Sequence, residues 1–133
     1  MPVIHAADAT VHDMHGTRFS SYASPSRGTG ELCAWRVDVP AGNAGVPHTV
    51  SQEEIVLVLG GTLHVTLSDG HGDAGERAGA VKGGPGDVFV IPAGSTVRVG
   101  TPDGEAASAW VTTRAGLKAT LADGSTVAPP WAR

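Results

Sequence analysis

The sequence predicts an all-β domain, a sandwich or a barrel. Short strand-like runs are separated by Gly- and Pro-rich turns, and no segment of useful length has helical periodicity. The 19 glycines and 9 prolines are spread along the chain, which indicates many turns between short strands. A length of 133 residues is typical of one domain. Within it we expect a β-barrel over 31–133, preceded by an irregular N-terminal arm or edge strand over 1–30.

The first strand expected in the barrel covers 31–39. Cys33, Trp35, Val37 and Val39 alternate with polar or small residues, so they share one face of the strand. Core packing is the expected role of this face. We also expect Trp35 to form one wall of a cavity. Cys33 is not expected to be a nucleophile, since no basic neighbour would lower its pKa.

The next strand, 54–59, is apolar on both faces after Glu54, so both of its faces should be covered. Its neighbour Glu53 should point to solvent. A second copy of the chain is the expected cover for the outer residues Ile55, Leu57 and Leu59, which predicts a homodimer.

The remaining strands follow in order along the chain. They are expected at 62–67, 86–94, 95–100, 107–113 and 118–130, with a polar loop over 68–80. In the last of these, the sequence Ala122-Asp123-Gly124-Ser125 is typical of a hairpin turn, because Asp-Gly readily supplies positive φ angles.

Charge and composition limit the possible partners. The net charge is −4 and Lys and Arg form no cluster, so we expect no nucleic-acid partner. No apolar run approaches the ~20 residues that span a bilayer, and the N-terminus lacks signal-peptide features. The single cysteine excludes an internal disulfide and fits a reducing compartment. We therefore expect a cytoplasmic protein with no membrane partner.

A histidine and a glutamate frame the start of the apolar strand at 54–59. The segment runs Gly42, five residues, His48, one residue, Val50, three residues, Glu54, six residues, Gly61. This spacing resembles the first signature of the cupin superfamily, except that Val50 stands where the signature has its second histidine.

A second motif follows at the separation found in small cupins. It runs Gly86, five residues, Pro92, one residue, Gly94, two residues, Val97. It resembles the second cupin signature, with Val97 in place of the histidine. The resemblance implies a single-domain jelly-roll barrel with a ligand cavity between two sheets.

In metal-dependent cupins, three histidines and a glutamate hold Fe, Mn, Ni, Zn or a similar ion. The resemblance places those four ligands at His48, Val50, Glu54 and Val97. Valine has no lone pair, so the chain falls short of even an open three-ligand site. We expect no cofactor. Any metal that did bind would use His48 and Glu54.

His48 and Glu54 in an apolar cavity predict acid–base chemistry. Some metal-lacking cupins resemble this arrangement, which implies an enzyme of the isomerase, cyclase or dehydratase type acting on a small molecule. His48 would move a proton and Glu54 would orient or assist it. The residues expected to bind the substrate are Trp35, Val50, Gln52, Val56 and Val97.

Two alternatives remain open. The barrel could be a non-catalytic binding module, with His48 and Glu54 bonded only to each other. It could instead be a metal-dependent oxygenase that recruits Gln52 or His64 as a further ligand.

Several aromatic and histidine residues have no clear place in this scheme. Phe19 and Tyr22 could close the cavity mouth. His15 lies in the N-terminal part without metal-ligand spacing, and Trp131 is expected against the barrel exterior or a partner subunit.

Overall fold

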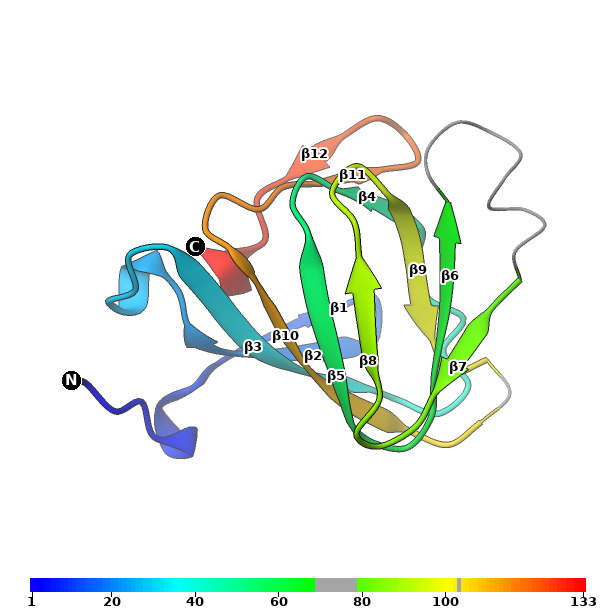
Figure 1. Ribbon diagram of the computed structural model, residues 1–133, viewed down its shortest axis with the longest axis horizontal. Coiled ribbons are helices and arrows are strands. Elements are labelled where there is room, and N and C mark those ends of the chain that lie inside the picture. Colours follow the sequence, from blue (N-terminus) through cyan, green and yellow to red (C-terminus); the bar gives the residue numbers. More distant parts are fainter. Residues whose placement is uncertain (69–78, 103) are drawn as a thin grey trace.

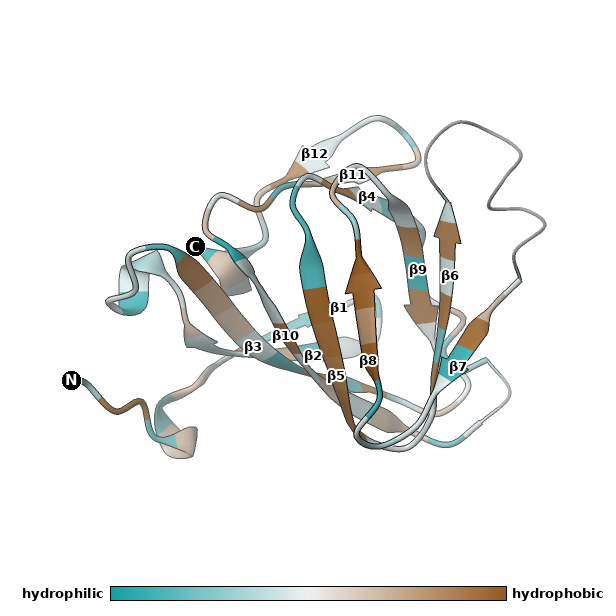
Figure 2. Ribbon diagram, viewed as in Figure 1, coloured by the Kyte–Doolittle hydropathy of each residue, from teal (hydrophilic) through white to brown (hydrophobic). Residues whose placement is uncertain are grey.

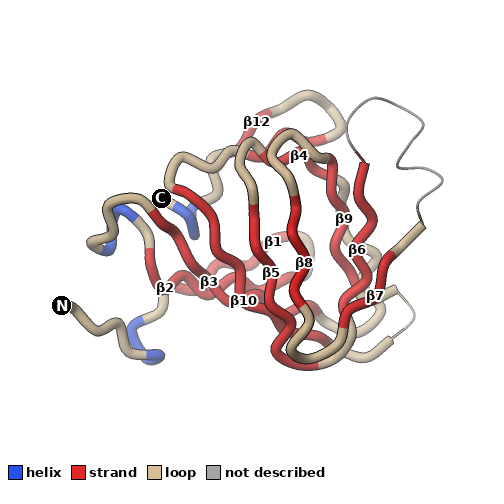
Figure 3. The backbone as a smooth tube through the Cα atoms, in the orientation of Figure 1, coloured by secondary structure: helices blue, strands red, loops and turns tan. Residues whose placement is uncertain are grey.

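The computed structural model describes residues 1–68, 79–102 and 104–133. Its strands form two six-stranded antiparallel sheets that face each other (Figure 1). Most of the loop predicted over 68–80 lies outside the described residues. The all-β prediction is confirmed, since the only described helices are short 3-10 turns (Figure 3). None of these helices has the length or apolar character needed to cross a membrane.

Sheet A has the strand order β1-β2-β3-β10-β5-β8. Its strands are β1 (Thr10–Met14), β2 (Thr17–Ala23), β3 (Leu32–Val39), β10 (Ala107–Arg114), β5 (Glu54–Gly60) and β8 (Val88–Ile91). Sheet B has the order β12-β11-β4-β9-β6-β7. Its strands are β12 (Thr126–Val127), β11 (Ala119–Leu121), β4 (His48–Val50), β9 (Thr96–Gly100), β6 (Leu63–Ser68) and β7 (Val81–Gly83).

The core lies between the sheets and follows the alternation in the sequence. In β3, Cys33, Trp35, Val37 and Val39 are all buried and face inward, as predicted. Sheet B meets them with inward side chains such as Leu63, which is fully buried. Each aliphatic side chain buried in this way stabilises the fold by roughly 1.5–3 kcal/mol.

Residues 1–30, expected to form an arm or edge strand, contribute the hairpin β1–β2. Strand β1 is the edge of sheet A, and β2 pairs with β3. The hairpin turns through His15 and Gly16, whose φ angles are 52° and 78°. Positive φ at both central residues is the type I′ geometry that suits a two-residue hairpin. Asn43 Nδ2 donates a hydrogen bond to the His15 carbonyl oxygen at 3.2 Å, which fixes the turn on the loop before β4.

The C-terminal segment departs most from expectation. Its predicted hairpin turn is present between β11 and β12, with Gly124 at φ 85°. The following 3-10 turn η3 (Pro130–Ala132) then packs against β1, β2 and β3. Trp131, expected on the exterior or against a partner, is only 7% exposed, so that prediction is wrong.

The outer face of β5 is not covered by the described residues. Ile55 and Leu59 are 38% and 42% exposed, and Val88 and Val90 of the neighbouring β8 are 52% and 56% exposed. Both strands are brown along most of their length in Figure 2. The expectation that both faces of 54–59 are covered therefore does not hold within one chain.

Candidate active site

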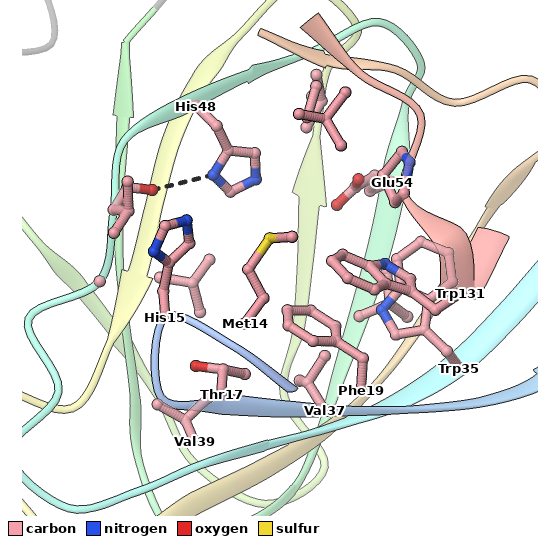
Figure 4. A pocket seen from close by; sticks show the side chains of 18 of the residues that line it. Met14, His15, Thr17, Phe19, Trp35, Val37, Val39, His48, Glu54 and Trp131 are labelled. Carbon is pink, nitrogen blue, oxygen red and sulfur yellow. Dashed lines mark hydrogen bonds between the residues drawn. The ribbon is translucent and has the colours of Figure 1, made fainter. Parts of the chain in front are cut away.

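A cavity of about 220 Å³ lies between the two sheets. Its walls come from both sheets, the β1–β2 hairpin and the C-terminal segment, and they are mostly aliphatic and aromatic (Figure 4). A mostly apolar, concave site with few polar groups is typical of small-molecule binding. Two of its polar groups are the predicted pair, His48 and Glu54.

Glu54 begins β5 on the inner face of sheet A. Strand alternation turns its side chain into the cavity, while its neighbour Glu53 is exposed, as predicted. The Glu54 side chain has no hydrogen-bond partner among the described residues, and the residue is 8% exposed. Burial disfavours the charged form and raises the pKa of this carboxyl from 4.5 to about 7. Near neutral pH, Glu54 is therefore available both as an acid and as a base.

His48 begins β4 on the inner face of sheet B. Its Nδ1 lies 3.0 Å from the Val46 carbonyl oxygen. Because a carbonyl oxygen only accepts hydrogen bonds, Nδ1 carries the proton of the neutral ring and donates it to Val46. The other nitrogen, Nε2, keeps its lone pair and faces the cavity (Figure 4). The backbone thus prepares His48 to accept a proton from a ligand.

No hydrogen bond joins His48 and Glu54, although both residues are described. They come from opposite sheets, and both side chains point into the cavity that lies between them (Figure 4). An inert pair would be hydrogen-bonded to each other, and His48 and Glu54 do not form this hydrogen bond. A ligand in the cavity can meet an acid on one side and a base on the other.

Three of the five predicted substrate-binding residues line the cavity: Trp35, Val50 and Val56. Gln52 and Val97 do not, which corrects their expected placement. Gln52 Nε2 donates a hydrogen bond to the Ala115 carbonyl oxygen at 2.8 Å, so its amide is held against the loop after β10. Val97 points inward but is 1% exposed, because core side chains surround it.

The described side chains do not fit a divalent metal. Val50 and Val97 offer no lone pair, and Gln52 is turned away. His64 lies on the face of β6 opposite to the inward Leu63, so it points away from the cavity. In the described ranges, no three His, Cys, Asp or Glu side chains gather in a way that could hold an ion. The donor set lacks the third protein ligand that an open catalytic site needs.

Two aromatic residues complete the wall of the site, one of them a candidate for the cavity mouth and the other expected elsewhere. Phe19 of β2 and Trp131 of η3 both line the cavity, and their rings stack with centroids 3.7 Å apart and planes 7° apart. Ser21 Oγ donates a hydrogen bond to the Trp131 carbonyl oxygen at 2.8 Å, which holds η3 against β2. Tyr22, the other candidate for the cavity mouth, lies against Trp110 instead.

The cavity also receives Met14 and His15 from the hairpin β1–β2. The spacing of His15 matches no metal motif, so the sequence predicts no role for it. A sequence signal exists, since His15-Gly16 stands between two alternating runs and is compatible with a two-residue hairpin.

Cys33 is buried, and burial raises the pKa of its thiol, which disfavours the reactive thiolate.

Comparison with protein families gives one match. The family model described as Cupin matches residues 15–128, which include both sequence motifs, the β1–β2 turn and most of the cavity wall. No curated protein matches the chain.

Solved structures with the same architecture include three with informative names. The polyketide cyclase RemF from Streptomyces resistomycificus has a TM-score of 0.69 at 18% identity, covering 86% of this chain and 79% of that one. KdgF from a Halomonas species has a TM-score of 0.64 at 19% identity, covering 85% and 93%. Pac13, a nucleoside dehydratase from Streptomyces, has a TM-score of 0.64 at 15% identity, covering 86% and 82%. At these identities the similarity establishes the fold alone.

Proposed function

The chain belongs to the cupin family, and on that premise we propose that it is a small-molecule enzyme that performs acid–base chemistry in an apolar cavity without a metal. The reaction is an isomerisation, a cyclisation or a dehydration. One observation carries the proposal: a buried carboxyl with a pKa of about 7, Glu54, shares a cavity with the free ring nitrogen of His48. Groups whose pKa lies near the working pH are the most effective proton-transfer catalysts.

The proposed chemistry begins at a carbonyl compound. His48 Nε2 removes a proton from the carbon next to the carbonyl, and protonated Glu54 gives its proton to the carbonyl oxygen, which leaves a neutral enol. Return of the His48 proton to another carbon, with recovery of the enol proton by Glu54, gives an isomer. Loss of a β-hydroxyl as water, with the proton of His48 and with recovery of the enol proton by Glu54, gives a dehydration. Attack of the enol carbon on a second carbonyl of the same molecule gives a cyclisation, in which His48 protonates the new hydroxyl oxygen and Glu54 recovers the enol proton.

The similar structures support this class of reaction. One is a polyketide cyclase and another is a nucleoside dehydratase, and both names describe reactions of this kind. We also propose a role in small-molecule biosynthesis. A cytoplasmic location is proposed as well, since the only cysteine, Cys33, is a free thiol and free thiols are typical of reducing compartments.

Proton exchange tests the proposal without knowledge of the natural substrate. The ketone 2-tetralone is incubated with the enzyme in D₂O, and deuterium incorporation next to the carbonyl is followed by NMR. The wild type should accelerate this exchange above the buffer rate. His48→Ala and Glu54→Gln should each reduce the acceleration by about 100-fold or more, because general acid–base catalysis contributes on that scale.

Trp110→Phe, a change on the outer face of sheet A, serves as the matched control and should keep the wild-type rate. An unchanged rate in His48→Ala would reject the role given to that residue. Selective ligand binding with no exchange above buffer would favour the non-catalytic binding module. Stoichiometric metal in the purified protein would favour the oxygenase alternative.

A further inference from the structure

We propose that the cavity selects a flat, neutral and largely apolar ligand, an aromatic or extended conjugated molecule that presents a carbonyl or hydroxyl oxygen to Glu54. Phe19 and Trp131 are the residues that make this selection. The inference rests on the proposed function, because it takes Glu54 as the group that meets the reacting oxygen.

The aromatic wall supports a flat ligand. Phe19 and Trp131 stack with their planes 7° apart and lie on the cavity, with the indole of Trp35 on the same wall (Figure 4). In this stack each ring covers one face of the other and leaves an outer face free, and a planar ligand gains offset-stacked contacts on such a face that a puckered ring cannot make.

This wall is held in place by hydrogen bonds of the main chain. The carbonyl oxygen of Trp131 accepts a hydrogen bond from Ser21 Oγ at 2.8 Å, and the carbonyl oxygen of Ala132 accepts one from the Cys33 thiol at 3.2 Å. The Trp131 ring is therefore positioned before a ligand enters. A preorganised wall loses less side-chain entropy on binding and gains selectivity for shape.

The electrostatics of the cavity support a neutral ligand. Of the described residues, no Lys or Arg lines the cavity. Glu54 is the acidic side chain among the described residues of the wall, and no permanently charged cation lies beside it, since the basic groups there are the imidazoles of His48 and His15. An anionic ligand would thus meet Glu54 without a Lys or Arg to compensate its charge, and desolvating it in an apolar cavity is unfavourable.

Glu54 also explains why the ligand should carry a carbonyl or hydroxyl oxygen. Its carboxyl is buried and has no hydrogen-bond partner among the described residues. A buried polar group without a partner is costly, so a ligand oxygen that bonds to it is favoured over a hydrocarbon surface.

Binding of three probes by isothermal titration calorimetry at pH 7 tests the selection. 2-Naphthol is flat and neutral, decahydro-2-naphthol has the same skeleton and hydroxyl but is not flat, and 2-naphthoate is flat but anionic. We expect 2-naphthol to bind about tenfold more tightly than either of the others. Equal binding of the flat and the saturated alcohol, or tighter binding of 2-naphthoate, would overturn the inference.

Variants assign the selection to the aromatic wall. Trp131→Leu should lower the affinity for 2-naphthol about tenfold and that for decahydro-2-naphthol less than threefold, so the preference is nearly lost. Trp131→Phe should retain it. Trp110→Leu makes the same change on the outer face, where Trp110 lies against Tyr22, and should leave both affinities unchanged.

Melting curves check that each variant is folded, and Phe19→Leu replaces Trp131→Leu if the latter does not fold. An equal loss for both alcohols in the leucine variant would show that the wall supplies bulk rather than aromatic recognition, and would overturn its assigned role. The two proposals fail separately. Catalysed exchange without probe selectivity rejects this inference, whereas selectivity without exchange rejects the proposed function.

Discussion

His48 lies directly across the β4–β9 ladder from Val97. Residues that face each other in an antiparallel pair have Cβ atoms roughly 4.5–5.5 Å apart on the same side of the sheet. The imidazole therefore has an aliphatic neighbour at the position where the cupin signature has its last histidine. Val50, two residues along β4, occupies the other histidine position, so aliphatic side chains stand beside His48 at both of these positions.

Restoring both histidines should restore metal binding. We expect the double variant Val50→His, Val97→His to bind Ni²⁺ or Zn²⁺ with His48 and Glu54, because the four side chains then match the cupin ligand set. The measurement is the melting temperature with and without each ion, since a ligand that binds only the folded state raises it. The wild type should not respond. A triple variant that adds His48→Ala should lose most of the gain, and a double variant without any response would contradict the shared geometry.

Glu54 should make stability depend on pH. The unfolded chain releases this proton above pH 4.5, whereas the folded chain keeps it until about pH 7. The unfolded state thus binds fewer protons between these values, so the free energy of unfolding falls as pH rises and then levels off. The total loss is about 3 kcal/mol.

Urea unfolding of the wild type and Glu54→Gln between pH 4.5 and 8 measures this effect. Other carboxyls contribute equally to both proteins, so the difference in unfolding free energy isolates Glu54. That difference should move by about 3 kcal/mol in favour of the glutamine variant as pH rises. A difference that stays constant over this range would mean that burial does not shift the carboxyl.

Gly61 should tolerate no side chain. It has a φ of 68°, and a Cβ there would lie 2.3 Å from the Ala106 carbonyl oxygen. Gly94 has a φ of 84° but nothing within 4 Å of its Cβ position. Gly94→Ala should therefore cost about 1–2 kcal/mol from backbone strain alone. Gly61→Ala should cost about 3 kcal/mol or more, because the main chain must also move. Equal unfolding free energies for the two variants would show that the close approach is unimportant.

The exposed apolar face of β5 and β8 should be covered by a second copy of the chain. We expect a dimer by light scattering at micromolar concentration, since Ile55, Leu59, Val88 and Val90 form a contiguous apolar surface. Val90→Glu should produce a monomer. Val81→Glu makes the same change at an equally exposed position on sheet B and should leave the dimer intact. A wild-type monomer under these conditions would contradict the proposal.

The sequence predicted those parts of the molecule that local patterns determine. The alternation in β3 identified its inner face, and two motifs brought His48 and Glu54 to one cavity. Val97 shows where such reasoning stops. Strand alternation places it inward, but whether an inward side chain lines a cavity or is enclosed depends on the volumes of neighbours from other strands.

The aromatic wall could not be predicted for a related reason. Phe19 and Trp131 meet only because η3 returns to the start of the chain and packs against β2. No local periodicity encodes a contact of such sequence separation. The β1–β2 hairpin was missed because its turn uses His15-Gly16 in place of the more usual Asn-Gly or Asp-Gly.

The position of Trp131 after the last strand separates the sheets from the closing of the cavity. The strands of sheet A end by Arg114, and β11 and β12 complete sheet B by Val127. One side of the cavity is then closed by the indole of residue 131, which stacks on Phe19. A variant shortened to end before Trp131 should therefore still form both sheets and yet fail to retain a flat ligand, so that folding and the ability to bind are separable.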